Sequence, residues 1–276
     1  MSSDVRVAEV VSALQAVGIS CLIMGGHAVR FYGLARHTND VDLHISPDQW
    51  DDLPTRLAQT KLSGSYSPSE GPSWRKVAFR RFQIGSLPDG REEWLEFWKE
   101  NHLLAAHDEL RNRAERGLYG GRELPFLGLS DLIRSKETER DADWQDIAFL
   151  EQFQDARLLA AIRSGAVRAP DAISLLRSQT GLVGYLEAGV LTAANASAAL
   201  ARTTNPVTQA ILTPFASAVD SAFDSPIEPI VLSRLRATSP ASSLHLALVE
   251  VVRRRYIALC KDADRRDKEM IRSQQP

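Results

Sequence analysis

GGHAVRFYGLARHTNDVDLHI, residues 25–45, is the stretch that decides the fold. Its two glycines end the dense apolar run ISCLIMGG, which predicts a short buried strand. Residues 27–32 predict a short helix that ends at Gly33. DVDLHI then alternates polar and apolar residues, and this alternation predicts a half-buried strand. The stretch therefore predicts strand, helix and strand in close succession.

Two acids stand on the second of these strands. Asp40 and Asp42 point to the same face, roughly 6–7 Å apart, while Val41 and Leu43 point into the core. Two carboxylates on one face can share a hard divalent cation such as Mg²⁺. The alternative is an exposed edge strand whose charges prevent aggregation.

The two glycines also have two interpretations. Gly25 and Gly26 follow a buried strand and begin a helix. Glycines in this position let backbone N–H groups approach a ligand, and a helix N-terminus favours anions. The alternative is a tight turn that needs only a positive φ. Together with the two acids, the first interpretation predicts a site for a triphosphate with its metal ion.

The elements around this stretch predict a sheet with helices. A helix is expected over residues 5–17, and Ser46-Pro47-Asp48 predicts the start of another. The stretch 61–73 is loop by composition, and residues 76–84 and 92–98 predict two strands. We therefore expect an α+β fold, with helices packed on a small mixed β-sheet.

The remainder of the chain is expected to be helical from about Asn101 onward. Residues 155–276 are rich in Ala and Leu, and residues 172–200 are typical of stacked short helices. We predict two domains, a mixed-sheet domain over 1–152 and an α-helical domain over 153–276. Ser130 is expected to cap a helix that buries Leu132 and Ile133.

Composition narrows the class of protein. The 276 residues are 44% hydrophobic and 25% charged, with a net charge of −2. These values are typical of a globular protein and argue against a broad basic surface for nucleic acid. Two cysteines form no disulfide framework, and His27, His37 and His44 lack zinc-ligand spacing. Because no apolar run has the length of a membrane span and the N-terminus lacks a signal-peptide pattern, we predict a cytoplasmic protein without a membrane partner.

Residues 24–45 resemble the signature of the DNA polymerase beta-like nucleotidyltransferase superfamily. They are most similar to its small bacterial members, which include abortive-infection and toxin–antitoxin nucleotidyltransferases. That signature is an apolar strand, Gly-Gly or Gly-Ser, a short helix, Gly, Arg-x-Thr and Asp-[Ile/Val]-Asp. The matching positions are Gly25, Gly26, Gly33, Arg36, Thr38, Asp40, Val41 and Asp42. The resemblance covers about residues 1–150, and we identify no family for 155–276.

The resemblance implies a third carboxylate on a neighbouring strand. The candidate is Glu96 in EEWLEFW, whose face also carries Trp94 and Trp98. The family more often has Asp at this place, so Glu is a departure from its pattern. Glu93 is the competing candidate if the register differs, and an exposed acid on an edge strand is the structural alternative.

A second block, LGLSDLIRSKETERDADWQDIAFLE, also resembles the family. Lys136, Arg140, Asp143 and Asp146 match its order of Lys, Arg and Asp-x-x-Asp. The resemblance implies that Lys136 faces phosphate and that Asp143, with Arg140, has a supporting or catalytic role. The alternative is structural, because Asp143 is also a suitable helix cap and Arg140 a suitable surface partner for it.

The function implied is transfer of a nucleoside monophosphate from a nucleoside triphosphate to an acceptor hydroxyl, with Mg²⁺ or Mn²⁺. Asp40, Asp42 and Glu96 would hold the metal and, with Lys136, form the catalytic set. Gly25, Gly26, Arg36, Thr38 and Lys136 would bind the phosphates. The acceptor is an RNA, a protein or a small molecule, and a cognate toxin or antitoxin is a candidate partner in phage defence. The alternatives are a catalytically weak, antitoxin-like binding module, favoured by Glu96, and a phosphate-binding scaffold without metal.

Overall fold

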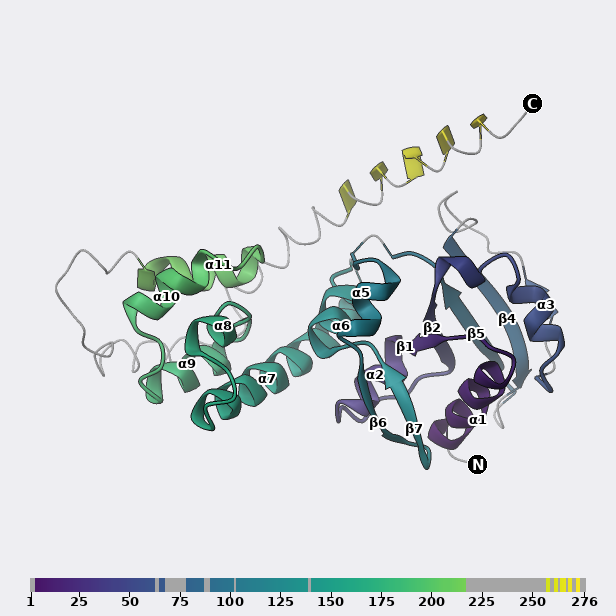
Figure 1. Cartoon of the computed structure of the whole chain (residues 1–276), viewed down its shortest axis with the longest axis horizontal. Helices are drawn as coiled ribbons and strands as arrows, with labels where there is room; N and C mark the ends of the chain where they lie inside the picture. The colour runs from purple at the N-terminus through teal and green to yellow at the C-terminus, as the bar shows by residue number, and fades with distance from the viewer. Residues whose placement is uncertain are drawn as a thin grey trace. The chain divides into compact units, whose positions relative to one another are not determined.

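The computed structural model describes residues 3–62, 65–67, 78–86, 90–101, 103–138, 140–216 and short pieces between 257 and 273. The chain divides into two compact units at Asp146–Ile147, with Arg254–Pro276 grouped with the first. This division falls within helix α7 (Asp141–Arg163), as does the expected boundary at residues 152–153. The first unit contains a sheet with packed helices and the second is helical where described (Figure 1). The predicted α+β class is confirmed.

A seven-stranded mixed sheet forms the centre of the first unit. Its strands are β1 (Cys21–Ile23), β2 (Asp40–Ile45), β3 (Ser65–Ser67), β4 (Phe79–Ser86), β5 (Glu92–Trp98), β6 (Glu115–Tyr119) and β7 (Arg122–Phe126). They lie in the order β3-β4-β5-β2-β1-β7-β6. The β2–β5 and β1–β7 pairs are parallel and the other pairs are antiparallel. The acidic strand β2 is therefore an interior strand, and the edge-strand explanation for its charges does not apply.

Short helices accompany the strands of this unit. They are α1 (Ser3–Ala16), α2 (Gly25–Phe31), the 3₁₀ turn η1 (Pro47–Gln49), α3 (Leu53–Ala58), α5 (His107–Asn112), α6 (Leu129–Ser135) and the start of α7. The predicted helix opening at Ser46-Pro47-Asp48 is only this 3₁₀ turn. Ser130 lies inside α6, whose N-cap is Gly128, so the predicted Ser130 cap is wrong. Leu132 and Ile133 are fully buried, as the apolar spacing predicts.

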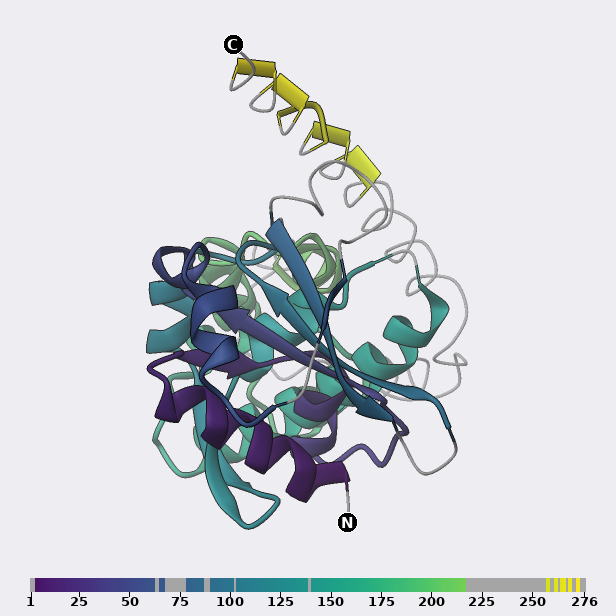
Figure 2. The ribbon, with the colours of Figure 1, turned by 90° about the vertical axis from the view of Figure 1, so that its right-hand side faces the viewer.

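The two faces of the sheet differ in chemistry. Val41 and Leu43 on β2, with Leu95 and Phe97 on β5, are buried on one face. Helix α1 lies across this side (Figure 2), where its Arg6 Nε lies 3.2 Å from Glu93 Oε2. Alternation along a strand then directs the acids of β2 and Glu96 of β5 to the opposite face.

The β6–β7 hairpin corrects the expectation of an all-helical chain after Asn101. Gly120 and Gly121, with φ of +57° and +82°, form its turn. Two successive residues with positive φ match the twist of a two-residue hairpin, and glycine adopts this conformation at little cost. The Gly-Gly pair between alternating segments was the available signal.

A second correction is β3, which lies within the expected loop 61–73; residues 63–64 and 68–77 lie outside the described part.

The described part of the second unit contains most of α7 and four short helices after it. They are α8 (Ala169–Ile173), α9 (Gln179–Glu187), α10 (Ala193–Leu200) and α11 (Pro206–Ala216), and the short helices predicted over 172–200 are confirmed. Residues 217–256 of the expected helical region lie outside the described residues. Within the described parts of the chain, no helix has the length and apolar character needed to cross a membrane.

A buried acid caps a helix in this second unit. Asp155 on α7 is 1% exposed and accepts hydrogen bonds from Ser178 Oγ (2.6 Å) and Ser178 N (2.8 Å). Ser178 is itself the N-cap of α9 and accepts from Gly181 N. A Cβ on Gly181 would come closer than 3.0 Å to the Asp155 carboxylate, so glycine is needed for this approach. Burial raises the pKa of Asp155 to about 7, although the bonds from Ser178 oppose this rise.

This pKa predicts that the protein loses stability as pH rises. The folded state holds a proton on Asp155 up to about pH 7, whereas the unfolded chain releases it near pH 4. The contribution of Asp155 to the free energy of unfolding therefore declines between these two values. We expect Asp155→Asn, which cannot ionise, to reduce the fall in melting temperature between pH 5 and 7.5. Asp171→Asn, at a half-exposed position, is the control. Equal slopes in wild type and Asp155→Asn would contradict this prediction.

Candidate active site

One cavity of about 250 Å³ in the first unit brings the predicted site residues together. All ten line it: Gly25, Gly26, Arg36, Thr38, Asp40, Asp42, Glu96, Lys136, Arg140 and Asp143. They come from three parts of the chain, namely residues 25–42, strand β5 and the α6–α7 turn. The tertiary fold therefore places residues that are up to 118 positions apart (143 − 25) around one space.

The carboxylates occupy adjacent strands. In the parallel β2–β5 pair, Asp42 lies opposite Glu96 and Asp40 lies opposite Trp94. Glu96 Oε1 also lies 3.1 Å from Nε of Arg81 on β4, whose guanidinium stacks over the Trp94 ring at 3.8 Å. The competing candidate Glu93 lies on the other face and pairs with Arg6 of α1. The register thus selects Glu96 over Glu93 as the acid beside Asp42.

Burial and mutual repulsion raise the pKa values of these acids. Removal from water raises the pKa of Asp40 and of Asp42, and the cations Arg81 and Lys136, respectively, oppose the rise. Burial and the charges of Asp42 and Asp40 raise the pKa of Glu96 to about 8, while Arg81 lowers it. A hydrogen bond joins Glu96 and Asp42, and it stabilises the protonated form of Glu96 and the ionised form of Asp42. In this bond the protonated Glu96 carboxyl is the donor and the ionised Asp42 carboxylate is the acceptor.

The glycine pair touches the acidic segment directly. Gly25 has φ +61°, and a Cβ there would lie closer than 3.0 Å to the Asp42 carboxylate. A Cβ on Gly26 would likewise lie closer than 3.0 Å to the Thr38 hydroxyl. Met24 N also donates to Asp42 O at 2.9 Å, which fixes the turn against β2. The glycines are therefore required by close packing against Asp42 and Thr38, as well as by the positive φ at Gly25.

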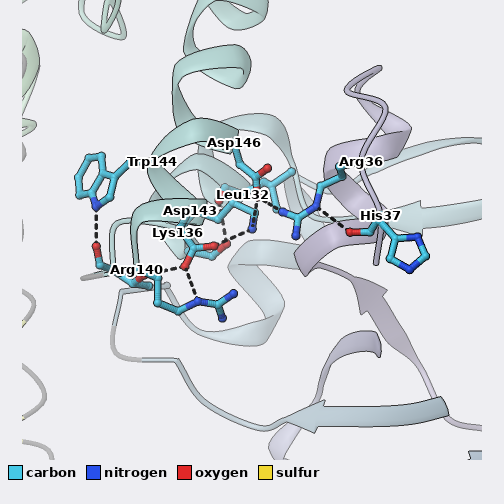
Figure 3. Close-up of polar contacts among 10 residues, drawn as sticks. Arg36, His37, Leu132, Lys136, Arg140, Asp143, Trp144 and Asp146 are labelled. Carbon is cyan, nitrogen blue, oxygen red and sulfur yellow. Dashed lines mark hydrogen bonds and ion pairs between the residues drawn. The ribbon is translucent and has the colours of Figure 1, made fainter. Parts of the chain in front are cut away.

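The cations of the site form one ion-pair cluster with two acids of α7 (Figure 3). Lys136 is buried, and its Nζ lies 3.1 Å from Asp143 Oδ1 and 2.8 Å from Asp146 Oδ2. Arg36 also pairs with Asp146. The Arg140 side chain is 68% exposed, and its Nε lies 3.5 Å from Asp143 Oδ2. Three cations and two carboxylates leave this cluster with one net positive charge.

One member of this cluster, Asp146, and one residue that contacts it, Thr138, were not among the predicted site residues. Asp146 does not line the cavity but joins Arg36 and Lys136 from behind it. Thr138 donates to Asp143 Oδ2 at 2.6 Å, and its carbonyl accepts from Trp144 Nε1. The Asp-x-x-Asp spacing was a signal for Asp146, whereas the sequence carried no signal for Thr138.

The histidines near the motif have structural partners. His27 Nδ1 lies 2.9 Å from the Tyr119 hydroxyl, and burial lowers its pKa to about 4. His44 Nδ1 lies 3.0 Å from His107 Nδ1, and the two buried rings stack. Among the described residues, no group of three or more His, Cys, Asp or Glu side chains has an arrangement that could hold a metal ion unaided.

No protein-family model and no curated protein matches this chain. The solved structures similar to it include an antigenic nucleotidyltransferase-like protein from Paracoccidioides brasiliensis. That structure is 19% identical, with 54% of this chain and 76% of that chain covered and a TM-score of 0.36.

Two further structures are similar at the same level. The lincomycin-bound lincosamide antibiotic adenylyltransferase LnuA is 14% identical, with 52% of this chain and 93% of that chain covered and a TM-score of 0.38. JHP933 from Helicobacter pylori is 12% identical, with 99% of this chain and 97% of that chain covered and a TM-score of 0.37. At these identities and TM-scores the similarities carry no argument about activity, which depends on the site itself.

The close approach of Gly25 to Asp42 predicts a specific loss of stability. In Gly25→Ala the new side chain must adopt an unfavourable positive φ and must also displace the Asp42 carboxylate. The free energy of unfolding should therefore fall by more than the ~1–2 kcal/mol that the positive φ alone costs. Gly121→Ala is the matched control, since Gly121 has φ +82° and nothing within 4 Å of its Cβ position. Denaturant unfolding measures both; equal losses would show that the Asp42 contact imposes no constraint.

Proposed function

We propose that this protein is a metal-dependent nucleotidyltransferase. The observation that carries the proposal is one cavity lined both by three acids, Asp40, Asp42 and Glu96, and by three cations, Arg36, Lys136 and Arg140. Acids that suit a divalent cation beside cations that suit phosphate are the chemistry needed to handle a triphosphate. The reaction is transfer of a nucleoside monophosphate to an acceptor hydroxyl.

The residues fit Mg²⁺ or Mn²⁺ bound together with a nucleotide. Mg²⁺ in such sites takes one or two protein carboxylates plus phosphate oxygens and water, so a cage of three protein ligands is not required. Asp40 and Asp42 are its proposed ligands, and Glu96 is the proposed third once it releases its proton. When bound, the metal would neutralise charge on the phosphates and lower the pKa of the acceptor hydroxyl.

The chain's own cations have separate proposed roles. Lys136 has three N–H donors, of which Asp143 and Asp146 occupy two, so one is available to a phosphate oxygen. Its buried position favours a role in neutralising charge that develops during transfer. Arg140 is exposed and more weakly held, which favours a role in capturing the triphosphate. The backbone at Gly25 and Gly26, with Arg36 and Thr38, is the proposed remainder of the phosphate site.

A second candidate is a catalytically weak binding module in a toxin–antitoxin or phage-defence pair. The hydrogen bond between Glu96 and Asp42 favours it, because a protonated acid is a poor metal ligand. The acceptor is proposed to be an RNA, a protein or a small molecule. The experiments below distinguish an enzyme from a binding module.

Mg²⁺ with a nucleoside triphosphate should raise the melting temperature. At 100 times the dissociation constant, linkage gives about 2.7 kcal/mol, or roughly 5–10 °C for a unit of this size. Asp40→Asn combined with Asp42→Asn should abolish the rise. The double variant should remain folded, because burial already opposes ionisation of both acids. Glu123→Gln, an exposed acid on β7, is the control; a full rise in the double variant would reject the metal assignment.

Transfer of labelled nucleotide to an acceptor in a cell lysate tests the enzyme directly. Lys136→Ala should lower the rate on the order of 100-fold while changing nucleotide affinity less, because it acts on developing charge. Arg140→Ala should instead weaken nucleotide binding. Lys99→Ala, a cation stacked on Trp50 outside the cavity, is the control. Nucleotide binding without labelling of RNA, protein or small molecules would support the binding module instead.

A further inference from the structure

Three neighbouring residues of the cavity wall are among those that the function proposed above does not use. They are Trp98 at the end of β5, and Asn101 and Leu103 in the segment that follows it. None of them is charged. One is a large aromatic ring, one a primary amide and one a branched aliphatic side chain. This combination is unlike the rest of the cavity wall, where acids and cations predominate.

Trp98 presents its ring next to the acids. It follows Glu96 by two residues on the same strand, so both point to one face of the sheet, roughly 6–7 Å apart along the backbone. The ring is half-buried and packs on Phe79, with centroids 4.6 Å apart and planes inclined by 50°. This contact supports the indole while part of it lines the cavity.

Asn101 offers an oriented amide beside this ring. Its Oδ1 accepts a hydrogen bond from Leu103 N at 3.0 Å. Because a backbone N–H can only donate, this bond identifies the oxygen and directs Nδ2 elsewhere. Among the residues that the structure describes, Nδ2 has no hydrogen-bond partner. The amide is therefore available to a polar group in the cavity.

The cationic part of the cavity comes from other segments. Arg36, Lys136 and Arg140 are its only Lys or Arg among the described lining residues, and they lie before β2 and around the α6–α7 turn. The uncharged residues Trp98, Asn101 and Leu103 come instead from the end of β5 and the segment after it. The cavity therefore has a cationic section that suits an anion and an uncharged section that suits a ring.

We propose that Trp98, Asn101 and Leu103 form the subsite for the nucleobase of the bound nucleotide. A nucleoside triphosphate joins a polyanion to a planar heteroaromatic ring, which matches the two sections of the cavity. The base stacks on Trp98 and contacts Leu103, and Asn101 Nδ2 donates to an acceptor on its edge. Stacking tolerates every base, so Asn101 is the group that distinguishes them. This inference rests on the proposed function.

The test compares two kinds of probe, the triphosphate chain alone and the same chain attached to a nucleoside. Dissociation constants for Mg²⁺–tripolyphosphate and for the Mg²⁺ complexes of ATP, CTP, GTP and UTP are measured by calorimetry. Trp98→Ala should weaken nucleotide binding roughly 10-fold or more and leave tripolyphosphate binding within about twofold. Trp98→Phe, which keeps a stacking ring, should restore most of the loss. Tripolyphosphate binding also reports that each variant is folded.

Trp94→Ala is the matched control. Trp94 is a half-buried tryptophan on the same face of the same strand, two residues before Glu96, but it does not line the cavity. The ratio of nucleotide to tripolyphosphate affinity should be unchanged in this variant. Asn101→Ala should bring the four nucleotide affinities closer together.

The outcomes separate this inference from the proposed function. If neither probe binds the wild type, the proposed function fails. If both bind and Trp98→Ala changes neither, or changes both equally, the base subsite is wrong while the function stands. If nucleotide binding is unchanged but the Michaelis constant of the acceptor rises, the ring subsite belongs to the acceptor and the inference is also overturned. If wild type and Asn101→Ala show equal affinities for the four nucleotides, Asn101 does not read the base.

Discussion

The close approach of Gly25 to the Asp42 carboxylate is the constraint on which the rest of the site depends. A helix start and an acidic strand seldom pack this closely, because a side chain on the helix would occupy the space of the carboxylate. Glycine removes that side chain and also adopts the positive φ that the turn requires. The backbone bond from Met24 to Asp42 then holds the two segments together. The Gly-Gly pair and the Asp-x-Asp strand are therefore one structural unit, although 13 residues lie between Gly26 and Asp40.

The ion-pair cluster fixes the cationic residues of the cavity, as the glycines fix Asp42. Lys136 ends α6 and pairs with two acids of α7, and one of these acids also pairs with Arg36 in the segment before β2. Removing one member of a buried pair leaves an uncompensated charge, which typically costs ~3–5 kcal/mol. The cluster therefore fixes three segments relative to one another. A cation held in this manner is also oriented before any ligand arrives, so little reorganisation is required when charge develops near it.

The sequence was most informative where a local pattern sets the structure. The bounds of β2 and the sheet face on which Glu96 lies follow from the alternation of polar and apolar residues. The start of α2 follows from the glycines. The chain could not show that Glu93 pairs with Arg6, because this requires knowledge of which helix covers which face. The β6–β7 hairpin was missed because a surrounding helical interpretation outweighed its Gly-Gly turn. The Asp-x-x-Asp spacing indicated Asp146, but its pairing with Arg36, 110 residues away, is visible only in the tertiary fold, as is the contact of Thr138 with Asp143.

The proton between Glu96 and Asp42 links the chemistry of the acids to their packing. Three carboxylates on one face repel one another, and Arg81 and Lys136 compensate only part of this charge. A proton on Glu96 removes one negative charge and adds a hydrogen bond. It therefore reduces the repulsion between the acids of β2 and β5 when no metal is bound. A divalent cation at Asp40 and Asp42 would compensate the same negative charge more strongly. The pKa of Glu96 would then fall, and Glu96 would release its proton. The longer side chain of glutamate suits this exchange, because Glu96 contacts both Asp42 and Arg81.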